Sequence, residues 1–143
     1  MTDQPTDTAA LLAALLRLAR RLRRARADHG ISPSKIAFLN QLAQDGALTA
    51  SALAQRARIQ PQSLTRMIAT LEGRGLIMRQ PDPDDRRQIL IAITADGQAL
   101  LEGDRARQEE WLRAAMQGSL DAAEQDRLHA IAPLLAKLLE AGA

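Results

Sequence analysis

The chain has 143 residues, which suits one domain with its own hydrophobic core. Hydrophobic residues make up 46% and charged residues 25%, an ordinary globular composition, and the formal net charge is only +2. The absence of cysteine excludes disulfides, thiolate metal sites and a cysteine nucleophile, and two distant histidines, His29 and His129, are too few for a zinc site. The longest apolar run, residues 9–16, is too short to span a membrane, and no basic segment precedes it. We therefore expect a soluble cytoplasmic protein.

Charge is distributed unevenly along the chain. Between Ala54 and Arg79 there are five arginines and one acid, whereas from Thr94 onward nine acids outnumber five bases. A basic middle segment on a small domain suggests a polyanionic partner, although a solvated arginine face is the commoner explanation.

The first predicted helix begins near Thr8 and ends at Gly30. Leucines at helical spacing form its apolar stripe, and six arginines between residues 17 and 26 occupy the other side. Those arginines either form a solvated face or contact a nucleic-acid backbone. The stripe consists of Leu11, Leu15, Leu18 and Leu22, widened by Leu12 and Leu16.

Two short helices are predicted next. Ser32 and Pro33 are typical of a helix start, and this helix ends at Asp45–Gly46. Thr49 is expected to cap a third helix, which packs Leu53 inward.

The fourth predicted helix, over about residues 61–74, has an apolar and a polar side. Leu64, Ile68 and Leu71 lie at i, i+4 and i+7 and face the core together. The third and fourth predicted helices, joined by a tight break, match a helix-turn-helix. In that motif the second helix, here the fourth, enters the DNA major groove. Its polar N-terminal side chains can hydrogen-bond base edges. The predicted DNA contacts are Gln60, Gln62, Ser63, Thr65 and Arg66.

A two-stranded hairpin follows. The short apolar segment 76–79 and the alternating isoleucines of 89–93 indicate two strands with a polar, turn-rich loop between them. At this tip Arg86 and Arg87 can reach a minor groove, where negative potential attracts arginine. Asp85 can pair with Arg87 and fix its direction.

Two more helices are predicted. Thr94 caps one that runs to about Met116 and is ended by Gly118. Asp121 and Glu124 form the pattern of a capping box for the last helix, in which Pro133 should cause a kink. Its apolar face consists of Leu128, Ile131, Leu135 and Leu138.

These elements predict a mainly α fold. A winged helix-turn-helix with a two-stranded β wing spans 31–93, and helices over 8–29 and 94–141 form a dimerisation module, all within a single domain, 1–143. The apolar stripes at both ends exceed what one small winged helix can cover, so we expect them to meet in a homodimer. The predicted interface residues are Leu11, Leu15, Leu18, Leu128, Leu135 and Leu138.

Several short motifs follow one another through the middle of the chain: Leu48-Thr49, Leu53-Ala54, Ser63-Leu64-Thr65-Arg66, Leu71-Glu72, Gly75-Leu76-Ile77, Asp82-Pro83-Asp84-Asp85-Arg86-Arg87, Thr94 and Gly97. Together they resemble the winged-helix region of the MarR family of bacterial transcription regulators. The most specific part is Asp85-Arg86-Arg87. The resemblance implies that Arg87 enters the minor groove and that Asp85 orients it.

The resemblance also implies how such a protein works. Members are homodimers that bind a pseudo-palindromic DNA operator, with half-sites about one turn (~10 bp) apart. Many release DNA when a small phenolic or anionic ligand binds between the winged helix and the dimer helices. His29 and Trp111 are candidate lining residues here, although an exposed helix end is the commoner explanation for His29, and interface or core packing is the commoner one for Trp111. We therefore predict a sequence-specific DNA-binding regulator, expected to be a repressor released by a ligand, with no cofactor.

Two other function classes stay open. A winged helix can serve for protein contact without DNA affinity, but the outward polar side chains of the fourth helix argue against this. An enzyme is disfavoured because the sequence has no nucleophile–base set, phosphate-binding glycine loop or metal-ligand constellation.

Overall fold

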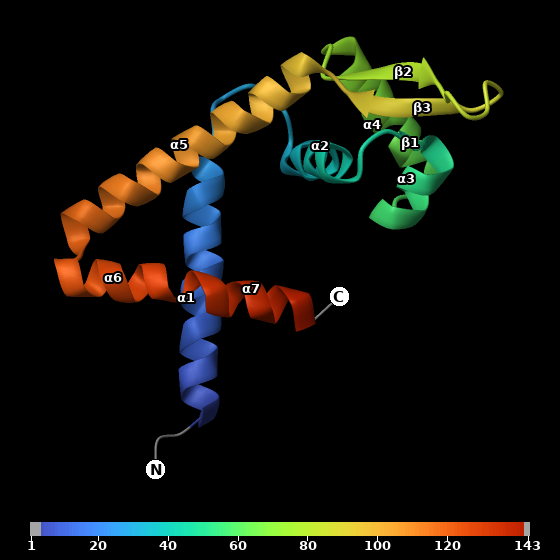
Figure 1. The fold of residues 1–143 in the computed structure, drawn as a ribbon. Coiled ribbons are helices and arrows are strands. Elements are labelled where there is room, and N and C mark those ends of the chain that lie inside the picture. The colour runs from blue at the N-terminus through green and yellow to red at the C-terminus, as the bar shows by residue number, and fades with distance from the viewer. Residues whose placement is uncertain (1–3, 142–143) are drawn as a thin grey trace. The chain divides into compact units, whose positions relative to one another are not determined.

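The computed structural model describes residues 4–141 and confirms the mainly helical winged-helix class (Figure 1). None of the helices in this range is long and apolar enough to cross a membrane. In chain order the elements are α1 (Gln4–Arg24), α2 (Pro33–Asp45), β1 (Leu48–Thr49), α3 (Ala50–Ala57), α4 (Pro61–Gly73), β2 (Ile77–Pro81), β3 (Ile89–Ile93), α5 (Ala95–Ser119), α6 (Ala122–Ala130) and α7 (Ala132–Ala141).

The chain forms two units. Residues 26–106 form the winged-helix unit, which contains α2 to β3 and the first part of α5. The chain on either side of that range forms the terminal-helix unit, which contains α1, the rest of α5, α6 and α7.

A single hydrophobic core holds the winged-helix unit together. The predicted core face of α4 is confirmed, because Leu64, Ile68 and Leu71 are all buried. The same cluster also contains Ile31, Ile36, Phe38, Leu39, Leu42, Leu53, Leu76, Ile77, Ile91 and Leu101.

The sheet has one strand more than the hairpin predicted from the sequence. Its order is β1-β3-β2, and β1 pairs antiparallel with β3 through Leu48 opposite Ile91. Two residues are too few to show an alternating pattern, so this strand had no signal of its own. The alternating isoleucines of β3 do not share one buried face. Ile91 is 2% exposed, but Ile89 is 47% exposed, because it lies at the tip end of the strand.

Local signals place the helix ends of this unit. The Thr49 side chain accepts from the Ala52 N–H (3.2 Å), as predicted for a cap. Gly75 adopts a positive φ of 71° at the end of α4. Its N–H donates to the Glu72 carbonyl and the Leu76 N–H to the Leu71 carbonyl, the paired bonds of a Schellman motif. This motif turns the chain directly from α4 into β2.

The terminal helices differ from their predicted bounds. α1 ends at Arg24 rather than Gly30, and α5 continues through Gly118 to Ser119, because a single glycine only weakens a helix. The Asp121–Glu124 capping box is confirmed. Pro133 lies in the first turn of α7, and the helical run breaks at Ile131 into α6 and α7.

Candidate nucleic-acid interface

The exposed side of α4 carries unpaired hydrogen-bonding groups. Gln60, Gln62, Ser63, Thr65 and Arg66 are all exposed, while the opposite side of the helix is in the core. The Thr65 hydroxyl donates to the Pro61 carbonyl (2.9 Å) and keeps only its acceptor capacity. The other four side chains form no hydrogen bond or ion pair with residues 4–141. A helix with free amide and guanidinium donors along one side is what direct readout of base edges requires.

The turn between α3 and α4 holds an arginine in an unusual backbone conformation. Arg58 has φ 51° and ψ 39°, and its N–H closes α3 by donating to the Ala54 and Gln55 carbonyls. Its side chain is exposed and forms no hydrogen bond or ion pair within the described range. Arg58 is one of the five arginines of the basic segment, and its sequence position alone predicts no particular role for it. A signal was present in the sequence, because an arginine stands just after a predicted helix, where glycine is favoured. Such a residue indicates a position kept for its side chain.

The basic segment is less positive than its sequence indicates. Arg56 pairs with Asp45 (2.8 Å), Arg79 pairs with Glu72 (3.2 Å), and Arg74 donates to the His29 carbonyl (2.6 Å). Of the five arginines counted there, only Arg58 and Arg66 have guanidinium groups without a partner in the described chain. Within this segment, the unpaired positive charge therefore lies at the turn and on the outer side of α4.

The Asp45–Arg56 pair connects α2 to α3. A side-chain hydrogen bond from Gln41 and then the Arg56 guanidinium hold the pKa of Asp45 below its usual value, because both stabilise the carboxylate. This exposed pair fixes the first helix of the helix-turn-helix without contributing to the outer side of α4.

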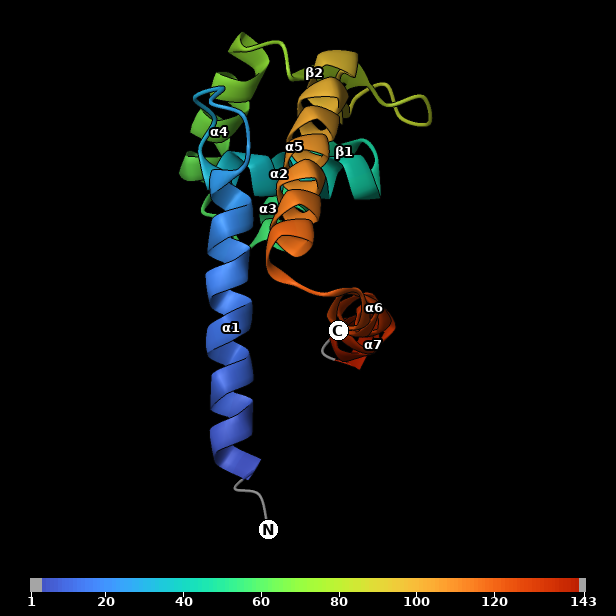
Figure 2. The same ribbon diagram turned by 90° about the vertical axis from the view of Figure 1, so that its left-hand side faces the viewer.

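The wing tip is shaped by two successive aspartate turns. Asp82 Oδ1 accepts from the Asp84 N–H (2.8 Å), and Asp85 Oδ1 accepts from the Arg87 N–H (3.1 Å). The predicted ion pair between Asp85 and the Arg87 guanidinium is not formed in the described chain. The Asp85 carboxylate instead accepts from the backbone N–H of Arg87. Asp85 therefore fixes the loop, and both arginine side chains at the tip remain exposed. The loop projects beyond the helices of its unit (Figure 1 and Figure 2).

His29 has a structural partner. Its Nδ1 accepts from the Ile31 N–H (3.2 Å), so the ring proton lies on Nε2, which donates to Asp104 Oδ2 (2.9 Å). Asp104 is 3% exposed and also accepts from the Ala27 N–H (3.1 Å). Both ring nitrogens are occupied, which leaves none for a ligand. Trp111 is half-buried and belongs to the other unit, so the two candidate ligand residues lie in different units.

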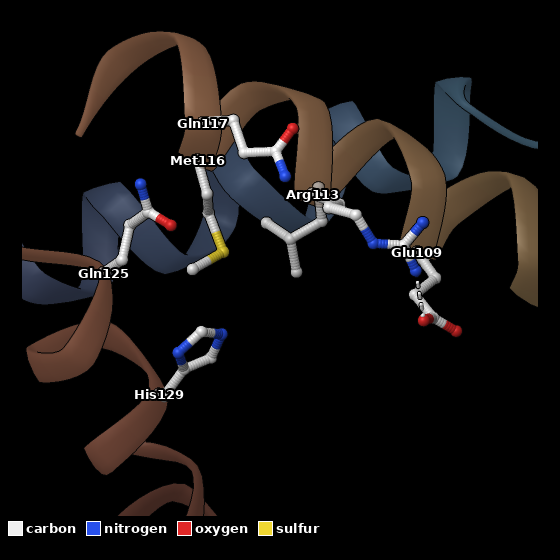
Figure 3. A pocket seen from close by; sticks show the side chains of 7 residues that line it. Glu109, Arg113, Met116, Gln117, Gln125 and His129 are labelled. Atoms are coloured by element: carbon white, nitrogen blue, oxygen red, sulfur yellow. Dashed lines mark hydrogen bonds and ion pairs between the residues drawn. The ribbon is translucent and has the colours of Figure 1, made fainter. Parts of the chain in front are cut away.

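A hollow exists elsewhere, within the terminal-helix unit (Figure 3). It has a volume of about 320 Å³, with α5 supplying its apolar wall from Leu112 and Met116 and α6 supplying His129. The Arg113 guanidinium at its edge is held by Glu109 (2.7 Å) and Glu110 (2.6 Å). No cluster of histidine and acidic side chains within residues 4–141 is suited to hold a metal ion.

Comparison with known proteins identifies the family. The model of the MarR family matches residues 31–89, which include the helix-turn-helix and most of the wing. A protein of Mycobacterium bovis named as an HTH-type transcriptional regulator is 38% identical over 127 residues, 89% of this chain and 88% of the relative. The chain belongs to the MarR family. It is a DNA-binding transcription regulator and not an enzyme, as the sequence indicated.

Solved structures agree with this assignment over nearly the whole chain. A crystal structure from Pseudomonas aeruginosa is 35% identical with a TM-score of 0.81, and the match covers 97% of this chain and 98% of the other. The RV1404 structure from Mycobacterium tuberculosis is 27% identical with a TM-score of 0.79, covering 99% and 95%. The terminal helices as well as the winged helix therefore have counterparts in other proteins.

Proposed function

We propose that the protein is a homodimeric repressor that reads a pseudo-palindromic operator through α4 and the wing and leaves it when a small phenolic or anionic ligand binds. The observation that carries the proposal is the exposed side of α4, where Gln60, Gln62, Ser63 and Arg66 present hydrogen-bonding groups that nothing in the described chain satisfies. At the wing tip, Arg86 and Arg87 are exposed in the same way.

Burial supports the dimer. Among the described residues, every buried apolar side chain except Met116 lies in the winged-helix unit, so the terminal-helix unit has almost no core of its own. Leu11 is 53% exposed on α1 and Leu138 is 65% exposed on α7. Leu15, Leu18, Leu128 and Leu135 are half-buried. A second copy that covers these leucines would supply the missing core.

Repression and ligand release are supported by relatives. A Bacillus subtilis relative, 33% identical over 73 residues, is named a transcriptional repressor. In BpsR of Bordetella bronchiseptica, 27% identical with a TM-score of 0.57, 6-hydroxynicotinic acid regulates DNA binding. For this chain we place the ligand in the hollow of Figure 3. Its volume suits a small ring, which Leu112 and Met116 would cover while His129 donates to an anionic oxygen.

A mobility-shift titration tests the DNA part of the proposal. The probe is DNA from upstream of the chain's own gene, at two salt concentrations, with random DNA as competitor. We expect a competitor-resistant complex that weakens steeply with salt. Absence of any complex at low salt would favour a winged helix that contacts protein.

Two substitutions test the individual contacts. Arg66→Ala should weaken the free energy of operator binding by about 1–3 kcal/mol and relax specificity at one base pair. Arg87→Ala should weaken binding without dissociating the dimer.

The ligand part is tested in the same assay. Adding 6-hydroxynicotinic acid to the complex of the unchanged protein should release DNA. The His129→Leu variant should still bind DNA but resist release, because the proposed donor is lost. Equal release of both proteins would exclude the hollow in Figure 3 as the site.

A further inference from the structure

Four arginines share one face of α1 and have no partner among residues 4–141. Arg17, Arg20, Arg21 and Arg24 lie at i, i+3, i+4 and i+7, a spacing that puts them on one side of the helix, opposite the stripe of Leu11, Leu15, Leu18 and Leu22. All four are exposed, and none forms an ion pair or hydrogen bond with any residue of the described range. We refer to these four residues as the arginine band.

The helix itself does not explain the band. Like charges at i, i+3 and i, i+4 repel, so the four side chains destabilise α1. Basic residues in the last turn, which include Arg21 and Arg24, interact favourably with the helix C-terminus, but Arg17 and Arg20 lie outside that turn. The single acid of α1, Asp7, is in its first turn. Interactions within α1 therefore do not explain the band, and a bound external anion would offset its repulsion.

The terminal-helix unit of a second copy offers few free carboxylates for this purpose, because only Asp7, Asp126 and Glu140 lack a partner within the described chain. In the terminal-helix unit, Glu109 and Glu110 are already paired with Arg113. Asp121 and Glu124 are occupied by each other's backbone in the capping box. An acidic surface with four free groups at matching spacing is absent from the described part of this unit.

Phosphates fit the band better. Arginine guanidinium groups bind phosphate oxygens in a bidentate manner, which lysine does not, and in this chain lysine occurs only at positions 35 and 137. The band extends from Arg17 to Arg24, seven helical steps or about 10 Å along the helix axis. One strand of B-DNA places a phosphate about every 3.4 Å of its axis, so a band of this length faces about three phosphates.

We propose that the arginine band is a second DNA-binding surface, which contacts the phosphate backbone of duplex DNA without reading its sequence. It lies in the terminal-helix unit, whereas the groups that read the operator lie in the winged-helix unit. Its contribution is therefore independent of any operator. The band holds duplex DNA through charge alone, and the protein has two separate surfaces for the same polymer.

The test measures salt dependence on a random-sequence 40-base-pair duplex. One variant changes all four band arginines to glutamine, which keeps a good helix former of similar length. The magnitude of the slope of log K against log[salt] should fall by about 2 to 3, because about three phosphate contacts are lost. A matched variant with lysine at the same four positions keeps the charge and should keep a slope close to that of the unchanged protein. Helix content by circular dichroism and the sedimentation coefficient should be the same in all three proteins.

A second set of variants separates binding by the arginine band from sequence-specific binding to the operator. In a protein carrying Arg66→Ala and Arg87→Ala, specific binding should be lost, while salt-sensitive binding to the random duplex persists until the band is also changed to glutamine. An unchanged salt slope in the glutamine variant would overturn the proposal. A glutamine variant that changes the monomer–dimer equilibrium but not the salt slope would also overturn it and assign the band to contact between copies.

Discussion

Arg58 has a backbone conformation that costs about 1–2 kcal/mol for a residue with a Cβ. Its backbone N–H caps α3, but its guanidinium is exposed and unpaired within the described chain, so no side-chain interaction there offsets that cost. A strained residue at a binding surface is best explained by what its side chain does in the complex. From the turn of the helix-turn-helix, this arginine is suited to contact a DNA phosphate.

Two substitutions separate strain from function at this position. Arg58→Gly should raise the free energy of unfolding by about 1 kcal/mol, because glycine adopts positive φ freely. Arg58→Ala keeps the strain. Both should weaken DNA binding to a similar extent on every sequence, with the salt slope reduced by about 1. Urea denaturation and a salt series on duplex DNA check this, and wild-type affinity in the glycine variant would show that the guanidinium does not meet DNA.

Asp104 is the second residue whose side chain can be tested alone. Two hydrogen-bond donors converge on its carboxylate, the Ala27 N–H and the Nε2–H of His29, and Arg26 Nε lies 3.9 Å from Oδ2 as an ion pair. The amide of an Asp104→Asn variant can accept a hydrogen bond from only one of these two donors, because its NH₂ group would face the other donor. One buried donor is then unpaired, which should lower the free energy of unfolding by about 1–3 kcal/mol. The exposed Glu102→Gln on the same helix should change it by less than about 0.5 kcal/mol. Equal effects would show that the buried carboxylate is dispensable.

At the scale of elements, the start of α5 is fixed by a close approach. Thr94 Oγ1 donates to the Gly75 carbonyl (2.6 Å) and accepts from the Gly97 N–H (3.1 Å). A Cβ on Gly97 would lie 2.3 Å from the Leu76 carbonyl oxygen and 2.6 Å from Ile93 Cγ1. Only glycine lets α5 begin directly against the two wing strands.

The two glycines in the first half of α5 should respond in opposite directions to alanine. Gly97→Ala should lower the free energy of unfolding by about 1–3 kcal/mol, because a backbone carbonyl must move. Gly103→Ala meets no atom within 4 Å and should raise it by up to about 1 kcal/mol, since glycine is a poor helix former. Thermal or urea melts of the two variants decide this. A stabilised Gly97→Ala would mean that α5 starts farther from the strands.

Elements with local signals were predictable from the sequence. The Thr49 cap and the Asp121–Glu124 capping box depend on residues three apart, and the core face of α4 depends on periodicity within one helix. β1 was not predictable, because only its pairing with β3 makes it a strand.

At the candidate site, too, features set within one helix were predictable, and those set by contacts between elements were not. The outward positions on α4 follow from helical periodicity, and their exposure agrees with the structure. The partners of the paired arginines do not follow from it, because Arg74 donates to the carbonyl of residue 29 and Arg56 finds its carboxylate on the preceding helix. A count of charges in a sequence segment therefore overstates the positive surface that such a segment presents.

At the scale of the whole molecule, the two units differ in how complete they are. The winged-helix unit has a core from α2 to α5, whereas the terminal-helix unit buries little beyond Met116 and leaves Leu134, Leu138 and Leu139 exposed on α7. Its stability should therefore depend on a second copy. We expect the melting temperature to rise with protein concentration, since association stabilises the folded state by mass action.

Leu138→Asp tests this dependence with little disturbance to the single chain, because the leucine side chain is already 65% exposed. A charge there should be buried without a partner in the dimer, so sedimentation should show monomers, and the melting temperature should lose its concentration dependence. Ala136→Asp adds the same charge on another side of α7 and should leave the dimer intact. Operator affinity should fall with Leu138→Asp alone, because one recognition helix reads only one half-site. A Leu138→Asp protein that remains dimeric would place the interface away from α7.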